Sequence, residues 1–568
     1  MTTIDTRTEA LASTEPSVAA RSLSDIAAWI TTTDHKRIGR MFVGVSLLLT
    51  LGVGVIGGLI GLERINPNGY VLDSGAFEQL FSLLRVGLAF FVVLPLTIGL
   101  AMAIVPLQVG ARSIAFPRAA LLGFWSWLFG SGLIIFSLAG NGGPGGGKPH
   151  LVDLYLGGVV LAIAGLVIAA STIAATVLTT RAPGLTLKRV PLFSYSALVG
   201  CVAIALTLPV LAAATVLVLV DHLYERSTFG GNAGVLQWTG WGLSAPAMLV
   251  YSLPLLGAIP DSISTLARRH LLQRPILRIG VGLAGVSAAA AVTQTALTLP
   301  ARHHSFKTWE NFLGAMVRYI KDTTPWLLFG ALPILGVLIV VGLTGKTMAA
   351  PKLNVKVLLS AATQFNLIGG ALLMAGFALH AVGDIAPIKL TGTVYEEGVS
   401  ILVGYSVVLL ALGALTFWGP KLWGRRIDDK KALPFVLLGA AGAVLASIPM
   451  IILGFMKQPG YTAGGFDKQS ATGVLNALSM AGHALMLATV GLFVLVALMS
   501  FTKGELAGDD PYDGQTFEWM TSSPPPVENF AVAPTAASSH PLTDLKPDGL
   551  NAPARTQTAK PAQTGALR

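Results

Sequence analysis

The sequence predicts an all-α membrane protein, a bundle of about twelve transmembrane helices. Of its 568 residues, 53% are hydrophobic and only 12% are charged, and the mean hydropathy is +0.69. This composition is too apolar for a soluble multi-domain protein and is typical of a polytopic membrane protein. A helix needs roughly 20 apolar residues to cross the hydrocarbon core. The segments that qualify are 39–62, 81–108, 119–139, 154–179, 191–220, 240–264, 279–300, 325–344, 357–383, 397–417, 434–456 and 473–501.

The chain divides into three parts. Residues 1–30 form a polar tail, and residues 31–505 form the membrane domain. Residues 506–568 are rich in Pro, Ala, Ser and Thr, so we expect a disordered tail there. No cleavable signal peptide is expected, since the first apolar run begins after about 38 residues that contain no small-residue cleavage site.

The net charge of +10 orients the protein in its membrane. Basic residues concentrate in alternate loops, whereas the intervening loops carry fewer. These residues include Lys36, Arg37, Arg40, Arg112, Arg118, Arg181, Lys188, Arg189, Arg268, Arg269, Arg274, Arg278, Lys346, Lys352, Lys356, Lys421, Arg425, Arg426, Lys430 and Lys431. By the positive-inside rule, both termini are cytoplasmic and the protein spans the plasma (inner) membrane. Because the charge is divided among loops in this way, we expect no nucleic-acid partner.

Cysteine usage excludes several cofactor sites. The single cysteine, Cys201, lies in the middle of an apolar segment. It cannot form an intrachain disulfide, and one thiolate cannot hold an iron–sulfur cluster, a Cys-rich zinc site or a two-cysteine copper centre within this chain.

Several stretches, in chain order over about 470 residues, resemble subunit I of cytochrome c oxidase, in the haem–copper oxidase superfamily. They are TTTDHKRIGRMF (31–42), FEQLF (77–81), VPLQVGARSIAFPR (105–118), TRAPGLTLKRVPLF (180–193), LTLPVLAAATVLVLVDHL (206–223), LPLLGAIPDSIST (253–265) and FWGPKLWG (417–424). The resemblance implies twelve helices around three pores. It also implies a respiratory-chain membrane subunit with haem and copper that passes electrons to oxygen and translocates protons.

The positions at which the resemblance places metal ligands do not carry histidine. In the second segment, the ligand of the low-spin haem corresponds to Leu84. In the sixth, the copper ligand corresponds to Ala245, and in the tenth, the two haem ligands correspond to Gly398 and Ser400. Aliphatic side chains offer no lone pair, and a neutral hydroxyl is a poor ligand for either metal. We therefore expect no catalytic, cofactor-binding or metal-binding residue of the family to be retained, and no bound cofactor.

Other functional positions of the family are also replaced. The acidic residue at the mouth of a proton pathway and its neighbouring asparagines correspond to Ser113, Ala120 and Leu121. The arginine pair that holds the haem propionates corresponds to Lys457 and Gln458. The substitutions thus fall on one set of functions: metal ligation, propionate binding and proton relay.

Two pairs of histidines leave an alternative open. His303 and His304 lie in a polar stretch after the seventh segment, where a solvated loop pair is favoured over a metal site. His380 and His483 fall inside predicted spans and would have to clamp a haem between them. An isolated histidine within the membrane is more often hydrogen-bonded to a helix carbonyl or to water.

Arg85 occupies the position next to the missing haem ligand. A charged side chain inside the bilayer is costly, so Arg85 is expected to face the bundle interior and to find a partner. Glu78 is the candidate partner, and the two would fill a collapsed cofactor pocket as polar groups. The alternative is that Arg85 lies near the helix end and extends to the outer interface.

Three functions remain. The leading interpretation is a catalytically inactive relative, a pseudoenzyme retained as a scaffold or accessory subunit among other respiratory-complex membrane subunits. The second is a functional haem–copper terminal oxidase with displaced ligands, which the shortage of histidines within the spans opposes. The third is a transporter or channel that uses the former pores, although few ionisable groups remain to relay protons.

Overall fold

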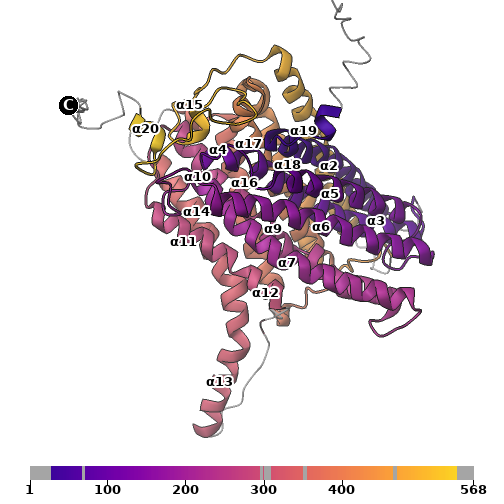
Figure 1. Cartoon of the computed structure of the whole chain (residues 1–568). Coiled ribbons are helices and arrows are strands. Elements are labelled where there is room, and N and C mark those ends of the chain that lie inside the picture. Colours follow the sequence, from indigo (N-terminus) through magenta and orange to yellow (C-terminus); the bar gives the residue numbers. More distant parts are fainter. Residues whose placement is uncertain are drawn as a thin grey trace, which may run out of the picture.

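The computed structural model describes residues 27–66, 71–293, 299, 309–349, 355–464 and 470–545. Within these residues the chain is helical, with isolated β-bridges and no extended strand, and twelve helices are long and apolar enough to cross a membrane. Figure 1 shows the resulting bundle, from which α13 projects at one end. The predicted fold class and number of spans are confirmed.

The first half of the chain contains six of the twelve spans found in the described residues. Its elements in order are α2 (His35–Ile65), α3 (Ser74–Val86), η1 (Gly87–Val93), α4 (Leu94–Gln108), α5 (Pro117–Ala139), α6 (Pro149–Thr179), α7 (Leu192–Leu223), α8 (Gly231–Thr239), η2 (Gly240–Leu243), α9 (Ala245–Leu256) and α10 (Ala258–Leu266). The helices α3, η1 and α4 together form one span, and α8 to α10 form another.

The second half contains the other six spans. It closes the bundle, because α19 packs against α2. Its elements are α11 (Arg274–Gly285), α12 (Ser287–Thr293), α13 (Trp309–Pro325), η3 (Trp326–Ala331), α14 (Leu332–Met348), α15 (Val355–Leu358), α16 (Ala361–Gly383), η4 (Ala386–Ile388), α17 (Val394–Trp423), α18 (Asp429–Phe455), α19 (Ser470–Lys503), η5 (Phe517–Trp519) and α20 (Pro541–Leu545).

Three spans form the interior of the bundle. The most apolar stretches of Ser74–Gln108 and Val394–Trp423 are completely buried, and that of Gly234–Leu266 is 89% buried. In each of the other nine spans found in the described residues, at most 56% of the corresponding stretch is buried. These inner spans are the ones in which the resemblance places the metal ligands, so the fold brings the expected positions to the centre.

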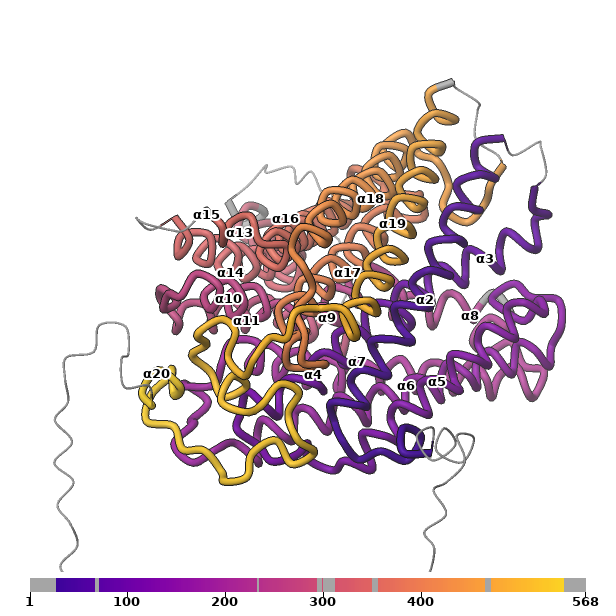
Figure 2. The backbone as a smooth tube through the Cα atoms, turned by 90° about the horizontal axis from the view of Figure 1, so that it is seen from above, coloured from indigo at the N-terminus to yellow at the C-terminus, as the bar shows by residue number. Residues whose placement is uncertain are grey.

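The C-terminal segment corrects the sequence-based expectation. Residues 506–545 are ordered in the structure, with Phe517, Trp519 and Phe530 buried, rather than part of a disordered tail. Figures 1 and 2 show this yellow segment against the end of the bundle at which α4 finishes. The many Pro, Ala, Ser and Thr residues make the composition of this segment typical of disorder. A few buried aromatic side chains nevertheless anchor it against the helix bundle. Residues 546–568 and 1–26 lie outside the described residues.

Polar contacts also hold this segment in place. Asn529 bonds to the ring of His35 and accepts a hydrogen bond from Lys36 Nζ at 3.0 Å. Gln108 Nε2 donates to Glu518 Oε1 at 3.0 Å. Burial raises the pKa of Glu518 to about 7. Hereafter the end of the bundle where α2 begins and α4 finishes is called the basic end.

Candidate functional site: a polar cavity among the inner helices

A narrow cleft lies where the resemblance places the low-spin haem. Leu84 from α3 and Ser400 from α17 line the same narrow cleft, which has a volume of only about 20 Å³. Leu84 is fully buried, and the Ser400 hydroxyl donates to the carbonyl of Glu396 at 2.8 Å. The two positions therefore line one cleft, but neither carries an imidazole and the cleft holds little space.

Direct contacts among the inner helices explain the lack of space. A Cβ placed on Gly404 of α17 would lie 2.9 Å from Leu88 Cδ2 and 3.5 Å from Met248 Cε. Leu88 belongs to η1 and Met248 to α9, so side chains from all three inner spans meet here. Close packing of this kind leaves little room between the three inner spans at the level of Gly404.

Gly398 does not face the interior. A Cβ at this position would lie 2.9 Å from both Met450 Cβ and the Ser447 carbonyl oxygen of α18. Val399, one residue later, lines the cavity described below. Counting along the sequence thus identifies the correct helix for Gly398 but not the face of that helix, because each residue turns the helix by 100°.

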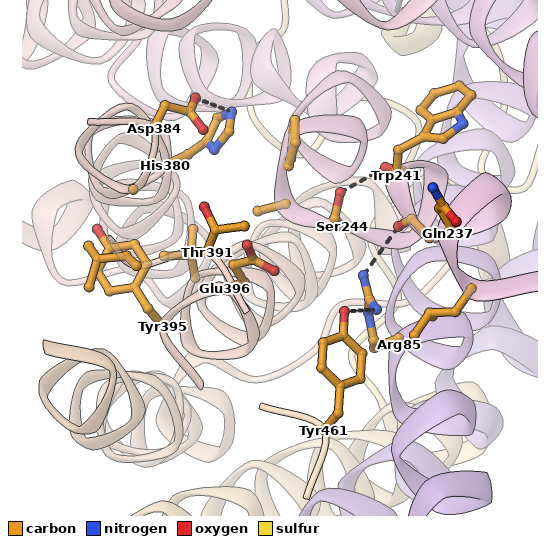
Figure 3. Close-up of a pocket in the computed structure, with 17 residues that line it drawn as sticks. Arg85, Gln237, Trp241, Ser244, His380, Asp384, Thr391, Tyr395, Glu396 and Tyr461 are labelled. Carbon is orange, nitrogen blue, oxygen red and sulfur yellow. Dashed lines mark hydrogen bonds and ion pairs between the residues drawn. The ribbon is translucent and has the colours of Figure 1, made fainter. Parts of the chain in front are cut away.

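A polar cavity remains at the end of the bundle opposite the basic end. Its volume is about 470 Å³, and Ala245 and Val399 are part of its wall. A second cavity of about 280 Å³ adjoins it through Trp241, Pro246, His380 and Asp384, which line both. The polar side chains labelled in Figure 3 are Arg85, Gln237, Trp241, Ser244, His380, Asp384, Thr391, Tyr395, Glu396 and Tyr461.

Arg85 lines this cavity, but it does not pair with Glu78. Its guanidinium donates to Tyr461 Oη at 2.9 Å and to the Gly240 carbonyl at 3.2 Å, and it lies over the Tyr461 ring. Glu78 is exposed and lies beside Gly145 in the loop between α5 and α6. The expected pairing of Arg85 with Glu78 is therefore wrong, because Glu78 lies on an exposed face of α3.

Acidic groups form the facing wall of the cavity. His380 Nε2 lies 3.5 Å from Asp384 Oδ2, and Figure 3 places this pair across the cavity from Arg85, with Glu396 between them. Asp384 Oδ2 is buried and accepts no hydrogen bond from the described residues. Burial and repulsion from Glu396 raise the pKa of Asp384 to about 7. The cavity thus has a guanidinium group on one side and carboxyl groups on the other.

The histidine pairs do not assemble a haem site among the described residues. His483 Nδ1 lies 2.6 Å from Tyr405 Oη, and its ring packs on Gly57 of α2, where an added Cβ would come within 2.4 Å of the ring. His380 lines the two cavities, whereas His483 lines neither. His303 and His304 lie outside the described residues.

The donor set does not fit haem or copper. Low-spin haem needs two axial donors, and an oxygen-activating copper needs about three imidazoles. The corresponding positions hold Leu84, Ser400 and Ala245, and the part of the chain that the structure describes has no group of three or more His, Cys, Asp or Glu side chains able to hold a metal ion.

One buried ion pair was not anticipated from the sequence. Arg64 at the end of α2 donates to Glu397 Oε2 at 2.8 Å, with the two side chains 0% and 4% exposed. Its guanidinium also donates to the Gly460 carbonyl at 2.6 Å and lies over the rings of Phe77 and Phe81. Both charged residues lie at helix ends, where the sequence predicts solvated side chains. The sequence shows only that each of these two helix ends carries a charged residue.

Comparison with known proteins identifies the family of the chain. A family model described as cytochrome c and quinol oxidase polypeptide I matches residues 37–485. The chain is 29% identical to a cytochrome c oxidase subunit 1 of Corynebacterium efficiens, over 94% of this chain and 91% of the relative. It is 26% identical to a cytochrome c oxidase subunit 1 of Bacillus subtilis (90% and 82% covered) and 27% identical to a quinol oxidase subunit 1 of the same organism (91% and 80% covered).

Proposed function

Since the chain belongs to the cytochrome c and quinol oxidase polypeptide I family, we propose that it is a non-redox member, retained as a scaffold or accessory subunit of a respiratory membrane complex. In this role it spans the plasma membrane with both termini in the cytoplasm. It contacts other membrane subunits through its lipid-facing helices and uses no haem or copper of its own.

The observation that carries the proposal is that Leu84 and Ser400 line one cleft of only about 20 Å³. A haem at this place would need imidazole nitrogens that neither side chain has, and it would have to separate α3 from α17. The inner helices are completely or almost completely buried. Separating them would expose apolar packing that stabilises the whole bundle.

Retention of the fold without the donors supports a structural role. The family match extends over 449 residues, from 37 to 485, so the helical framework has been kept as a unit. The replaced positions are those that hold metals. Neighbouring subunits would recognise the outer surface of the helix bundle. That surface depends on the helical framework and does not depend on bound haem or copper.

The test is the metal and haem content of the full-length chain purified from its own membranes. We expect no stoichiometric haem in a reduced-minus-oxidised spectrum or in a pyridine haemochromogen assay, and no stoichiometric copper by elemental analysis. The matched control is a catalytic relative purified in the same detergent, which must retain its cofactors. Stoichiometric haem in this chain would refute the non-redox proposal in favour of an oxidase with displaced ligands.

A second measurement addresses the scaffold role. A tagged chain isolated in a mild detergent is expected to bring other respiratory membrane subunits with it in fixed proportion. Recovery of the chain alone, under conditions in which the catalytic relative keeps its partners, would overturn the scaffold role.

A further inference from the structure

At the basic end, a large cleft is lined by the first turns of α2 and the last turns of α19. Its volume is about 700 Å³, and it is distinct from the cavities around Arg85. Residues of α4 and α17 form its floor, and the Pro-rich stretch 524–527 of the C-terminal segment closes one side. The cleft therefore lies where the helices meet both lipid and the aqueous phase.

The rim of this cleft is positively charged. Arg37 and Arg40 lie in the first two turns of α2, and their guanidinium groups stand 5.6 and 5.1 Å from the centroid of the Trp29 ring. Lys36 is already neutralised by Asp34 at 2.7 Å. Among the described residues, neither Arg37 nor Arg40 forms an ion pair with a carboxylate. Arg37 donates to the Ala28 carbonyl, and Arg40 donates to the carbonyls of Lys36 and Leu422. These partners are neutral, so an anion from outside the chain can still be attracted by both positive charges.

The walls below the rim are apolar. Val43 and Leu47 continue along α2, and Phe501, Leu498 and Val494 run in parallel along α19. At 1.5 Å per residue, the stretch from Phe501 to Val494 covers about 10 Å of depth. Phe501 and Leu498 remain 44% and 52% exposed, so the chain itself does not fill this groove.

We propose that this cleft is a binding site for an anionic phospholipid. The phosphate lies between Arg37 and Arg40, and an acyl chain follows the groove between α2 and α19. Basic side chains beside a membrane surface attract anionic headgroups, and a tryptophan is favoured at the level of the headgroups. Lys36, Arg37 and Arg40 outnumber Asp34 in the lining of the cleft, which leaves a net charge of +2. This excess favours an anionic lipid over a zwitterionic one, and the apolar groove favours a lipid over a free phosphate.

The charge is tested by measuring binding of phosphatidylglycerol and phosphatidylcholine to the purified full-length chain by native mass spectrometry. The wild-type chain is expected to retain phosphatidylglycerol preferentially. The Arg37→Gln/Arg40→Gln double variant is expected to lose about tenfold in affinity for phosphatidylglycerol. The matched control, Lys430→Gln/Lys431→Gln, removes two exposed charges elsewhere at the basic end and is expected to bind as the wild type does.

The groove is tested by a variant that leaves every charge in place. A Cβ on Gly44 meets no atom within 4 Å, and Gly44 lines the cleft. Gly44→Leu should therefore fold normally, occupy the path of the acyl chain and weaken phosphatidylglycerol binding. Equal binding of the two lipids to the wild type, or undiminished phosphatidylglycerol binding by both Gly44→Leu and the arginine double variant, would overturn the proposal. Equally tight binding of glycerol phosphate would show an anion site without the lipid groove.

Discussion

Arg64 Nη1 and Glu397 Oε2 lie 2.8 Å apart and join the last turn of α2 to the first turn of α17. The pair is almost completely buried, and Arg64 extends it to the Gly460 carbonyl and to the rings of Phe77 and Phe81. The Arg64 guanidinium therefore joins the spans of α2 and α17. It also contacts α3 and the loop after α18. This connection lies next to the closed cleft between Leu84 and Ser400.

Removing one member of this pair should destabilise the bundle. Glu397→Leu leaves the guanidinium buried without its carboxylate, for which we expect a loss of about 3 to 5 kcal/mol. The measurement is thermal unfolding of the purified variants in one detergent. Arg112→Gln breaks the pair with Glu528, whose side chains are 60% and 69% exposed, and should change stability by less than about 0.5 kcal/mol. Equal effects of the two substitutions would contradict a stabilising role for burial.

Gly398 should tolerate no larger side chain, although the resemblance places a ligand there. Gly398→Leu brings a Cβ to within 2.9 Å of the Ser447 carbonyl oxygen, so α17 and α18 must move apart. The expected cost is about 1 to 3 kcal/mol. The same substitution at Gly58 of α2, where an added Cβ meets nothing within 4 Å, should be nearly neutral. Thermal unfolding that ranks these two variants in the opposite order would refute the assigned helix face.

Asp384 should make the stability of the protein depend on pH. Its pKa is raised to about 7 in the folded chain, mainly by burial, above an unfolded value near 4. The folded state therefore holds more protons between these values, and stability should fall as the pH rises from about 4 to 7. The loss is at most about 4 kcal/mol at higher pH, since one pKa unit corresponds to about 1.4 kcal/mol.

Asp384→Asn removes this titration while keeping the shape of the side chain. Unfolding temperatures measured across this pH range should vary less in the variant than in the wild type. Glu528→Gln, at an exposed carboxylate, serves as the control and should leave the pH profile unchanged. A wild-type profile for Asp384→Asn would show that another group dominates.

The C-terminal segment should contribute to stability up to Leu545. A chain ending at Leu545 keeps every described contact of the segment and should unfold as the full-length chain does. A chain ending at Glu505 loses the buried Phe517 and Trp519 and leaves Gln108 without Glu518. Burial of each aromatic ring corresponds to about 3 to 5 kcal/mol, so this truncation should lower the unfolding temperature strongly. Equal unfolding temperatures for the two truncations would mean that the segment does not stabilise the bundle.

Much of the fold could be predicted because lipid imposes a simple rule on sequence. Each crossing needs a long apolar run, so the twelve spans were found from composition along the chain. Their ends were less certain: the tenth span was predicted over 397–417 and extends over Val394–Trp423. Thr393 caps its start, and Gly424 ends it with a φ of 80°, features that hydropathy does not register.

The candidate site could be predicted only in part. Leu84 and Ser400, which were identified from the aligned motifs, line one cleft, and Arg85 lines both this cleft and the larger cavity. Its partner is Tyr461, 376 positions away in the chain, rather than the neighbouring Glu78. No local pattern predicts such a contact, because it depends on how far the loop after α18 folds back over α3.

The amino-acid sequence alone determined the number of membrane crossings and the side chains available at the old ligand positions. No fold can supply an imidazole where the chain has leucine, alanine or serine. Tertiary structure decided which of those side chains line a common cleft, where cavities remain and which charged groups form ion pairs. A helix turns by 100° at each residue, so the face that Gly398 or Val399 presents depends on the rotation and packing of α17 against its neighbours.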